Sequence, residues 1–198
     1  MQAGAGDFEM ADVARAAGVS EGLAYHYYKS EAGLTAAVIE DFYGRYSAVA
    51  NVRMDPTEPW GARERRRLGA VIAFLYADPL APVILGSLSV TPAAAAVQAA
   101  QSRSMAILAS GNIRNGVEQG VLAADIDPDI AGPAVIGSIW TAFVHAFATD
   151  PRPTQEALSQ QLWALIAGAV RLDQDGASFS TTGAKPRSVP ISRSQNLK

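Results

Sequence analysis

The sequence predicts an all-α protein with a short helical N-terminal segment and a larger helical bundle. Apolar residues recur three or four positions apart, the period of an amphipathic helix, and no segment alternates convincingly with the period of two that a strand shows. Proline and glycine interrupt this pattern at intervals suited to helix ends. Hydrophobic residues make up 49% of the 198 residues, enough to bury a core.

Two short helices, Met10–Ala17 and Glu21–Tyr28, are predicted at the N-terminus. Gly18 separates them and can adopt the left-handed backbone of a sharp turn without strain. Ala14 is small enough for a close helix crossing, and Ser20 is suited to cap the second helix. This arrangement is a helix-turn-helix, whose second helix would enter a DNA major groove.

A third, longer helix is predicted after Ser30, and it ends before the proline-containing loop Asn51–Pro59. Its expected core face repeats at helical spacing: Leu34, Val38, Phe42 and Tyr46, with Ile39 and Tyr43 alongside.

The rest of the chain predicts further helices separated by proline and glycine. Pairs of a capping residue and proline, Thr91-Pro92 and Asp127-Pro128, mark two helix starts, and Asp78-Pro79 and Gly120 mark two helix ends. The expected bounds are about Gly61–Ala77, Leu80–Ser89, Pro92–Gln119, Pro128–Thr149 and Thr154–Leu172.

These elements predict three regions. Residues 1–46 form the helix-turn-helix domain, and residues 47–172 form the bundle. Residues 173–198, rich in Ser, Thr, Gly and Pro, are expected to be a disordered tail.

The segment Ile130–Thr149 is uncharged and long enough to span a bilayer. It contains Ser138, Thr141 and His145, and no basic cluster flanks it, so we interpret it as a fully buried helix of the bundle. The N-terminus lacks a charged start followed by an apolar run. We therefore expect a cytoplasmic protein without a membrane partner.

Composition excludes several classes of chemistry. The chain has no cysteine, and its two histidines are far apart in sequence, so we expect no disulfide, no metal centre and no thiolate catalysis. No nucleophile elbow, paired-histidine motif or phosphate-binding glycine loop is present, so we expect neither an enzyme nor a cofactor. With a net charge of −3, any nucleic-acid contact must come from a local patch.

The N-terminal segment combines, at fixed spacing, Val13-Ala14, Ala17-Gly18-Val19-Ser20, Gly22, Tyr25, Tyr28, Ser30 and Leu34. This motif resembles the DNA-binding domain of TetR-family transcriptional repressors. The segment Gly120–Pro128, which leads into a long apolar helix, is similar to the C-terminal half of that family. The resemblance implies a homodimer, a variable ligand pocket in the C-terminal helices, and release of operator DNA when a small molecule binds.

The resemblance also implies which residues contact DNA, with Ser20–Tyr27 as the recognition helix. Tyr25 and Lys29 would contact phosphates. Core packing is the alternative for Tyr25 and the favoured interpretation for Tyr28, and a solvated surface position is the alternative for His26. The predicted DNA-binding residues are Ser20, Glu21, Gly22, Leu23, Tyr25, His26, Tyr27 and Lys29.

Two departures from the family pattern bear on DNA binding. The family has another helix before this motif, whereas nine residues precede Met10 here, so we expect that the first helix is missing. Glu31 stands where the family usually has a phosphate-binding lysine. Residues 1–47 hold seven acids and three bases, a balance of −4. We favour a start placed too far downstream, and a diverged copy with weak DNA affinity is the alternative.

The run Arg63–Arg67 (RERRR) is basic and opens the helix after the loop. We interpret it as a solvated helix face, and a contact to flanking DNA is the alternative.

The predicted ligand site lies in the bundle. The helix Pro128–Thr149 combines an apolar stripe (Ile136, Trp140, Phe143 and Phe147) with a polar line (Ser138, Thr141 and His145). Buried polar groups need partners, which a ligand, a dimer partner or a neighbouring backbone can supply. The candidate ligand-binding residues are Phe74, Trp140, Thr141, Phe143 and His145, with Tyr76 and Met105 as further candidates, and core packing is the alternative for each apolar one.

The last helix carries Leu158, Leu162, Leu165 and Ile166, which we expect to join the preceding helix in a four-helix dimer interface. The sequence thus predicts a DNA-binding transcriptional regulator: a homodimeric repressor that a small ligand releases from its operator DNA. The alternative is a diverged or truncated helical dimer that binds a small apolar ligand but not DNA.

Overall fold

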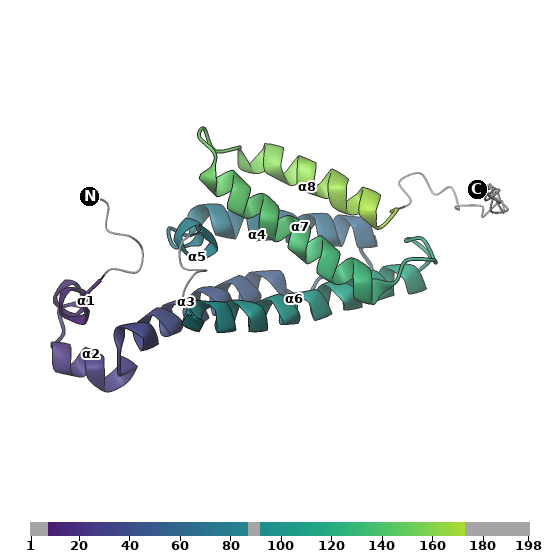
Figure 1. Cartoon of the computed structure of the whole chain (residues 1–198). Coiled ribbons are helices and arrows are strands. Elements are labelled where there is room, and N and C mark those ends of the chain that lie inside the picture. Colours follow the sequence, from purple (N-terminus) through teal and green to yellow (C-terminus); the bar gives the residue numbers. More distant parts are fainter. Residues whose placement is uncertain (1–7, 87–91, 173–198) are drawn as a thin grey trace, which may run out of the picture.

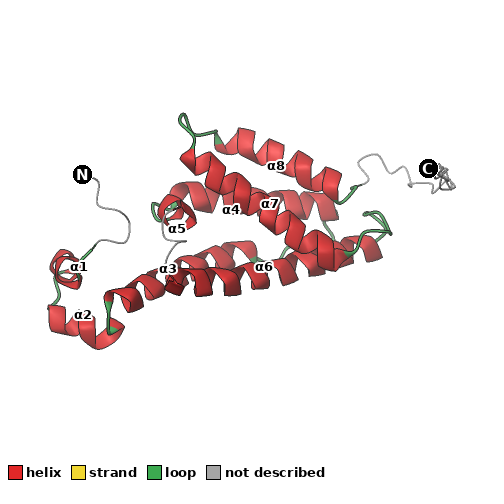
Figure 2. Ribbon diagram, viewed as in Figure 1, coloured by secondary structure: helices red, strands yellow, loops and turns green. Residues whose placement is uncertain are grey.

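The computed structural model describes residues 8–86 and 92–172, and every regular element in these ranges is a helix (Figure 2). The predicted all-α architecture, a helix-turn-helix followed by a larger bundle, is confirmed. The helices are α1 (Met10–Ala17), α2 (Glu21–Tyr28), α3 (Glu31–Ala50), α4 (Trp60–Ala77), α5 (Ala81–Gly86), α6 (Pro92–Glu118), α7 (Pro128–Ala148) and α8 (Gln155–Ala169).

α3 joins the two parts of the molecule. It begins beside α1 and α2 at one end and runs into the bundle, where it packs on α4 and α6 (Figure 1). α7 packs chiefly on α6, and α8 packs on α4 and α7. In the C-terminal half of α3, Arg45 forms an ion pair with Asp78, the residue that caps the C-terminal end of α4.

The helix ends follow the local signals in the sequence. The Ser20 hydroxyl accepts a hydrogen bond from the Leu23 amide, and the Asp127 carboxylate accepts one from the Asp129 amide. Gly120, after α6, has a φ of +72° and ends that helix as predicted. Thr91 and the predicted tail 173–198 lie outside the described residues.

The core face predicted on α3 is buried, except that Val38 is half-buried. On α4, Leu68, Val71, Ile72 and Leu75 recur at helical spacing and all lie in the main hydrophobic cluster. A smaller cluster of Met10, Ala14, Ala24 and Leu34 holds the helix-turn-helix together. A third cluster, around Trp60, Ile113, Leu122 and Val170, closes the far end of the bundle.

Gly132 marks a close approach of α7 to α6. A Cβ atom at this position would lie 2.6 Å from the Ser110 amide nitrogen, so a larger residue cannot fit without moving a backbone. This crossing fixes how α7 lies on the bundle.

Two helices differ from the expectations. α7 is not fully buried, since only 17% of its most apolar window is buried within the chain, although by length and composition it could cross a membrane. On α8, Leu158, Leu162 and Ile166 point into the core of the same chain, and only Leu165 is exposed. Helical spacing identifies an apolar stripe, and it does not say which neighbour covers that stripe.

Candidate DNA-binding helix and ligand cavity

The turn between α1 and α2 has the geometry of a helix-turn-helix. Gly18 adopts a φ of +70°, and the Val19 amide donates to the Ala14 carbonyl, 3.0 Å away. Val19, the residue after this glycine, is 42% exposed. α2 is held to its neighbours by one buried side chain, Ala24. The remaining residues of α2 are therefore free to meet a partner surface.

All eight predicted DNA-binding residues are exposed: Ser20, Glu21, Gly22, Leu23, Tyr25, His26, Tyr27 and Lys29. Among Leu23, Tyr25 and Tyr27, Tyr27 is the most accessible, at 70%. Tyr28, interpreted from sequence as a core residue, is exposed as well, because α2 lies at the tip of the molecule (Figure 1). The DNA contacts themselves stay a prediction.

Two charged side chains near α2 form hydrogen bonds with backbone groups of the protein itself. The Lys29 ammonium donates to the His26 carbonyl at 2.6 Å, which satisfies the C-terminal end of α2. Glu31 Oε1 accepts a hydrogen bond from the Met10 amide, 3.3 Å away, at the N-terminal end of α1. The sequence identified Glu31 only as a departure from a phosphate contact, whereas in the fold it caps a neighbouring helix.

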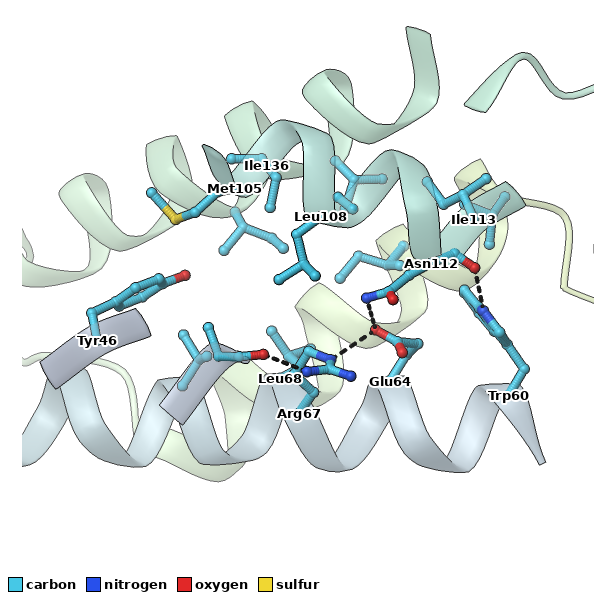
Figure 3. Close-up of a pocket in the computed structure, with 17 residues that line it drawn as sticks. Tyr46, Trp60, Glu64, Arg67, Leu68, Met105, Leu108, Asn112, Ile113 and Ile136 are labelled. Atoms are coloured by element: carbon cyan, nitrogen blue, oxygen red, sulfur yellow. Dashed lines mark hydrogen bonds and ion pairs between the residues drawn. The ribbon is translucent and has the colours of Figure 1, made fainter. Parts of the chain in front are cut away.

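An apolar chamber of about 100 Å³ lies between α3, α4, α6, α7 and α8 (Figure 3). Side chains such as Leu68, Met105, Leu108, Ile113 and Ile136 form its walls. Tyr46 reaches toward it from α3 (Figure 3). Burial raises the pKa of Tyr46 to about 12, so its hydroxyl stays protonated at neutral pH.

One end of the chamber is polar. Glu64 accepts from Arg67 Nε at 3.2 Å and from Asn112 Nδ2 at 3.3 Å, and the Trp60 indole N–H donates to the Asn112 carbonyl at 2.7 Å (Figure 3). Burial raises the pKa of Glu64, and this effect outweighs the lowering effect of Arg67.

Beyond this polar end lies a second, polar cavity of about 290 Å³, here called the vestibule. Trp60, Glu64, Arg67, Leu108 and Asn112 line both the chamber and the vestibule, so the two adjoin. The vestibule is also lined by Asn51, Arg53, Arg63 and Asn115.

The basic run Arg63–Arg67 is therefore not simply a solvated helix face. Arg63 is buried and donates to Asn115 Oδ1 at 3.2 Å, and Glu64 and Arg67 are both largely buried. Arg66 is exposed and pairs with Glu58, as a solvated face would predict. The sequence did contain a sign that Glu64 and Arg67 face the core. They lie four residues before Leu68 and Val71, so they are on the same side of α4 as these buried residues.

None of the five predicted ligand-binding residues lines the chamber or the vestibule. Phe74 and Trp140 pack beside the aromatic rings of α3, with Trp140 stacked on Tyr43 at 6.0 Å between centroids. Phe143 is fully buried, and Thr141 and His145 are exposed on the outer side of α7. Of the two further candidates, Met105 lines the chamber, and the Tyr76 hydroxyl donates to the Pro153 carbonyl at 2.8 Å.

Uncharged exposed residues recur along the outer sides of α7 and α8, and we call this set the outer face. On α7 it holds Ala134, Gly137, Thr141 and Val144, and on α8 it holds Ala157, Gln161, Ala164 and Gly168, all of them exposed. Small residues of this kind allow close helix packing. Within the described part of the chain, no group of three His, Cys, Asp or Glu side chains is placed to hold a metal ion.

Comparison with known proteins identifies relatives of this arrangement. Residues 1–38 match the model of the bacterial regulatory proteins of the tetR family. The chain is similar in structure to the fatty acid degradation regulator FadR from Bacillus halodurans, with a TM-score of 0.70 and 18% identity, over 81% of this chain and 87% of that one. No curated protein matches the chain in sequence.

Two further structures are similar at comparable coverage. A TetR-family regulator from Pectobacterium atrosepticum gives a TM-score of 0.58 at 22% identity, over 84% of this chain and 83% of that one. A putative tetR-family regulator from Shewanella sp. PV-4 gives 0.63 at 18% identity, over 82% and 86%.

Proposed function

We propose that this chain, which carries the N-terminal domain and has the fold of the TetR-family regulators, is a homodimeric repressor that a small ligand releases from operator DNA. The observation that carries the proposal is α2. It follows a helix-turn-helix turn, is anchored by Ala24, and exposes every predicted DNA-contacting residue. A recognition helix must present its side chains in this way to reach base edges in the major groove.

The outer face supports a homodimer. It is uncharged and rich in small residues, and it lies on two adjacent helices, as a four-helix interface between two copies requires. Such a dimer would carry two recognition helices, which must sit about 34–36 Å apart to enter successive major grooves.

Contacts at the C-terminal end of α3, which lies beside the cavity, support an effect of ligand binding on DNA binding. Arg67 lines the cavity and donates to the carbonyl of Ala50, the last residue of α3, and to the carbonyl of Val52, just beyond it. The other end of α3 begins beside α1 and α2. A ligand that forms hydrogen bonds with Arg67 would therefore compete with the Ala50 and Val52 carbonyls for its N–H donors. Weakening these contacts would let α3 shift, and a shift of α3 would move the recognition helix.

The relatives are transcription regulators, which points to a non-enzymatic role, and we place the protein in the cytoplasm with its DNA. The second candidate function, a ligand-binding helical dimer without DNA affinity, is favoured by one observation. Residues 1–47 carry seven acids against three bases, and such a balance opposes binding to a phosphate backbone.

The test is fluorescence anisotropy of the full chain on duplex DNA from upstream of its own gene, over a salt series, against a scrambled duplex of equal length. We expect binding that weakens steeply with salt and prefers the upstream DNA. Tyr27→Ala should weaken binding by about tenfold, which is about 1.4 kcal/mol. Arg65→Ala, an exposed position on α4, is the matched control. No binding to either duplex would support the second candidate instead, and equal binding to both duplexes would contradict operator recognition.

A further inference from the structure

The chamber and the vestibule together have the shape and charge of a site for an amphipathic molecule. The chamber is walled by aliphatic side chains, whereas the vestibule is lined by asparagines and arginines. Their volumes are about 100 and 290 Å³, each below the usual range for small-ligand sites, on the order of 300–1,000 Å³. Because the two share lining residues and adjoin, one small molecule can place an apolar group in the chamber and a polar group in the vestibule.

The charges around the shared polar end favour an anion. Arg53, Arg63 and Arg67 line the cavities, and Glu64 is the one acidic side chain among the residues that do so. Glu64 already accepts hydrogen bonds from Arg67 and Asn112, which partly offset its charge. An incoming negative group would meet an excess of positive charge at this end.

At the polar end that the chamber and the vestibule share, two arginine side chains keep N–H donors that can bind a ligand. Arg67 uses Nε toward Glu64 and Nη1 toward the Ala50 and Val52 carbonyls, and its Nη2 donates to no group in the described part of the chain. Arg63 uses Nη2 toward Asn115. Arg63 lines the vestibule and Arg67 lines both cavities, and within the described residues each keeps N–H donors that no protein acceptor uses. Each guanidinium can therefore donate to one oxygen of a planar carboxylate.

We propose that the ligand is a small carboxylic acid in its anionic form, with an apolar body about the size of a benzene ring or a short alkyl chain. The apolar body fills the chamber beside Leu68, Met105 and Ile136, and the carboxylate binds Arg67 and Arg63 at the entrance of the vestibule. This inference rests on the proposed function, because it names the ligand class of the same cavity.

The test is isothermal titration of the full-length protein with matched pairs that differ only in charge: benzoate against benzamide, and hexanoate against hexanamide. We expect each acid to bind at least about tenfold more tightly than its amide, a difference of about 1.4 kcal/mol. Arg67→Gln should abolish this preference. Arg66→Gln, one position away but lining neither cavity, should keep it.

Because Arg67 also holds the end of α3, folding of the variants is checked by circular dichroism, and two further measurements do not depend on Arg67→Gln. Arg53→Gln changes an exposed residue on the rim of the vestibule and should weaken the acids but not the amides. Added salt should also weaken the acids selectively in the wild-type protein.

Equal affinity for acid and amide, a preference that survives in folded Arg67→Gln, or no binding of any of the four probes would each overturn the proposal. The DNA assay separates this outcome from failure of the proposed function. An acid that binds without releasing DNA contradicts ligand-controlled repression and leaves the ligand class intact. DNA release by the amides as effectively as by the acids contradicts only the ligand class.

Discussion

The carboxylate of Glu31 accepts a hydrogen bond from the Met10 amide, 3.3 Å away, and so links the first turn of α3 to the first turn of α1. Glu9, the residue before α1, forms no side-chain cap. Glu31 therefore supplies an acceptor for one of the amides that an isolated helix leaves unpaired, and its negative charge lies near the positive end of the helix dipole.

Removing this acceptor should loosen α1. We expect Glu31→Ala to lower the local stability of α1 by about 1 kcal/mol, as loss of a cap does, and Glu31→Gln to lower it by less because the amide oxygen still accepts. The measurement is hydrogen exchange of the amides in Met10–Ala17. Identical exchange in Glu31→Ala and the wild type would show that the contact does not stabilise the helix. Glu40→Ala, an exposed glutamate on the same helix, is the control.

Arg67 should stabilise the C-terminal end of α3. Loss of its hydrogen bonds to the Ala50 and Val52 carbonyls and to Glu64 should lower the free energy of unfolding by about 2 kcal/mol in Arg67→Gln. Arg66→Gln removes a more exposed pair with Glu58 and should cost less than about 1 kcal/mol. Urea denaturation followed by circular dichroism compares the two, and equal losses would contradict the assignment.

Glu64 should make stability depend on pH in an unusual direction for an acid. Because burial raises its pKa, the folded protein binds the proton more tightly than the unfolded chain. Its contribution to stability is complete below the ordinary pKa of a glutamate and is lost as the pH rises through the raised pKa of the folded state. Glu64→Gln imitates the protonated form and keeps an acceptor for Arg67.

We therefore expect the Tm of Glu64→Gln, relative to the wild type, to increase as the pH is raised from acidic to neutral. Thermal denaturation across this range is the measurement. Glu40→Gln, at an exposed position, should show no such trend. A Tm difference that is constant or falls with pH would contradict the role assigned to burial.

The α6–α7 crossing should not tolerate a side chain at position 132. Gly132→Ala places a methyl group 2.6 Å from the Ser110 amide nitrogen, and such overpacking costs typically about 1–3 kcal/mol. Gly111→Ala is the matched control, because its Cβ meets no atom within 4 Å and alanine favours the helix. Chemical denaturation should show opposite signs for the two variants, and a neutral Gly132→Ala would disprove the close approach.

The outer face should set the oligomeric state. Gly137→Arg introduces a long charged side chain at an exposed position of α7 where the single chain offers no obstacle. It should convert a dimer to a monomer with unchanged helix content, because a buried unpaired charge disfavours the interface. Ile107→Arg, on a 74% exposed position of α6, should leave the dimer intact. Size-exclusion chromatography with light scattering distinguishes the species, and a dimer in both variants would place the interface elsewhere.

Local sequence signals determined much of what was predicted about this protein. The turn at Gly18, the caps at Ser20 and Asp127, and the stop at Gly120 depend on residues within a few positions of one another. The buried stripes of α3 and α4 follow from the helical period for the same reason. The N-terminal motif was sufficient to identify the family resemblance, which the match over residues 1–38 and the similar structures support.

The tertiary structure alone decided where the cavity lies and what lines it. Trp60 and Asn112, joined by a hydrogen bond, are 52 residues apart, and Glu64 and Asn112 are 48 residues apart. Helical spacing places a side chain on a face, but the neighbour of that face is chosen by packing between distant segments. For this reason Thr141 and His145, polar residues on an apolar helix, lie on its outer side, while charged residues of α4 point inward to the cavity.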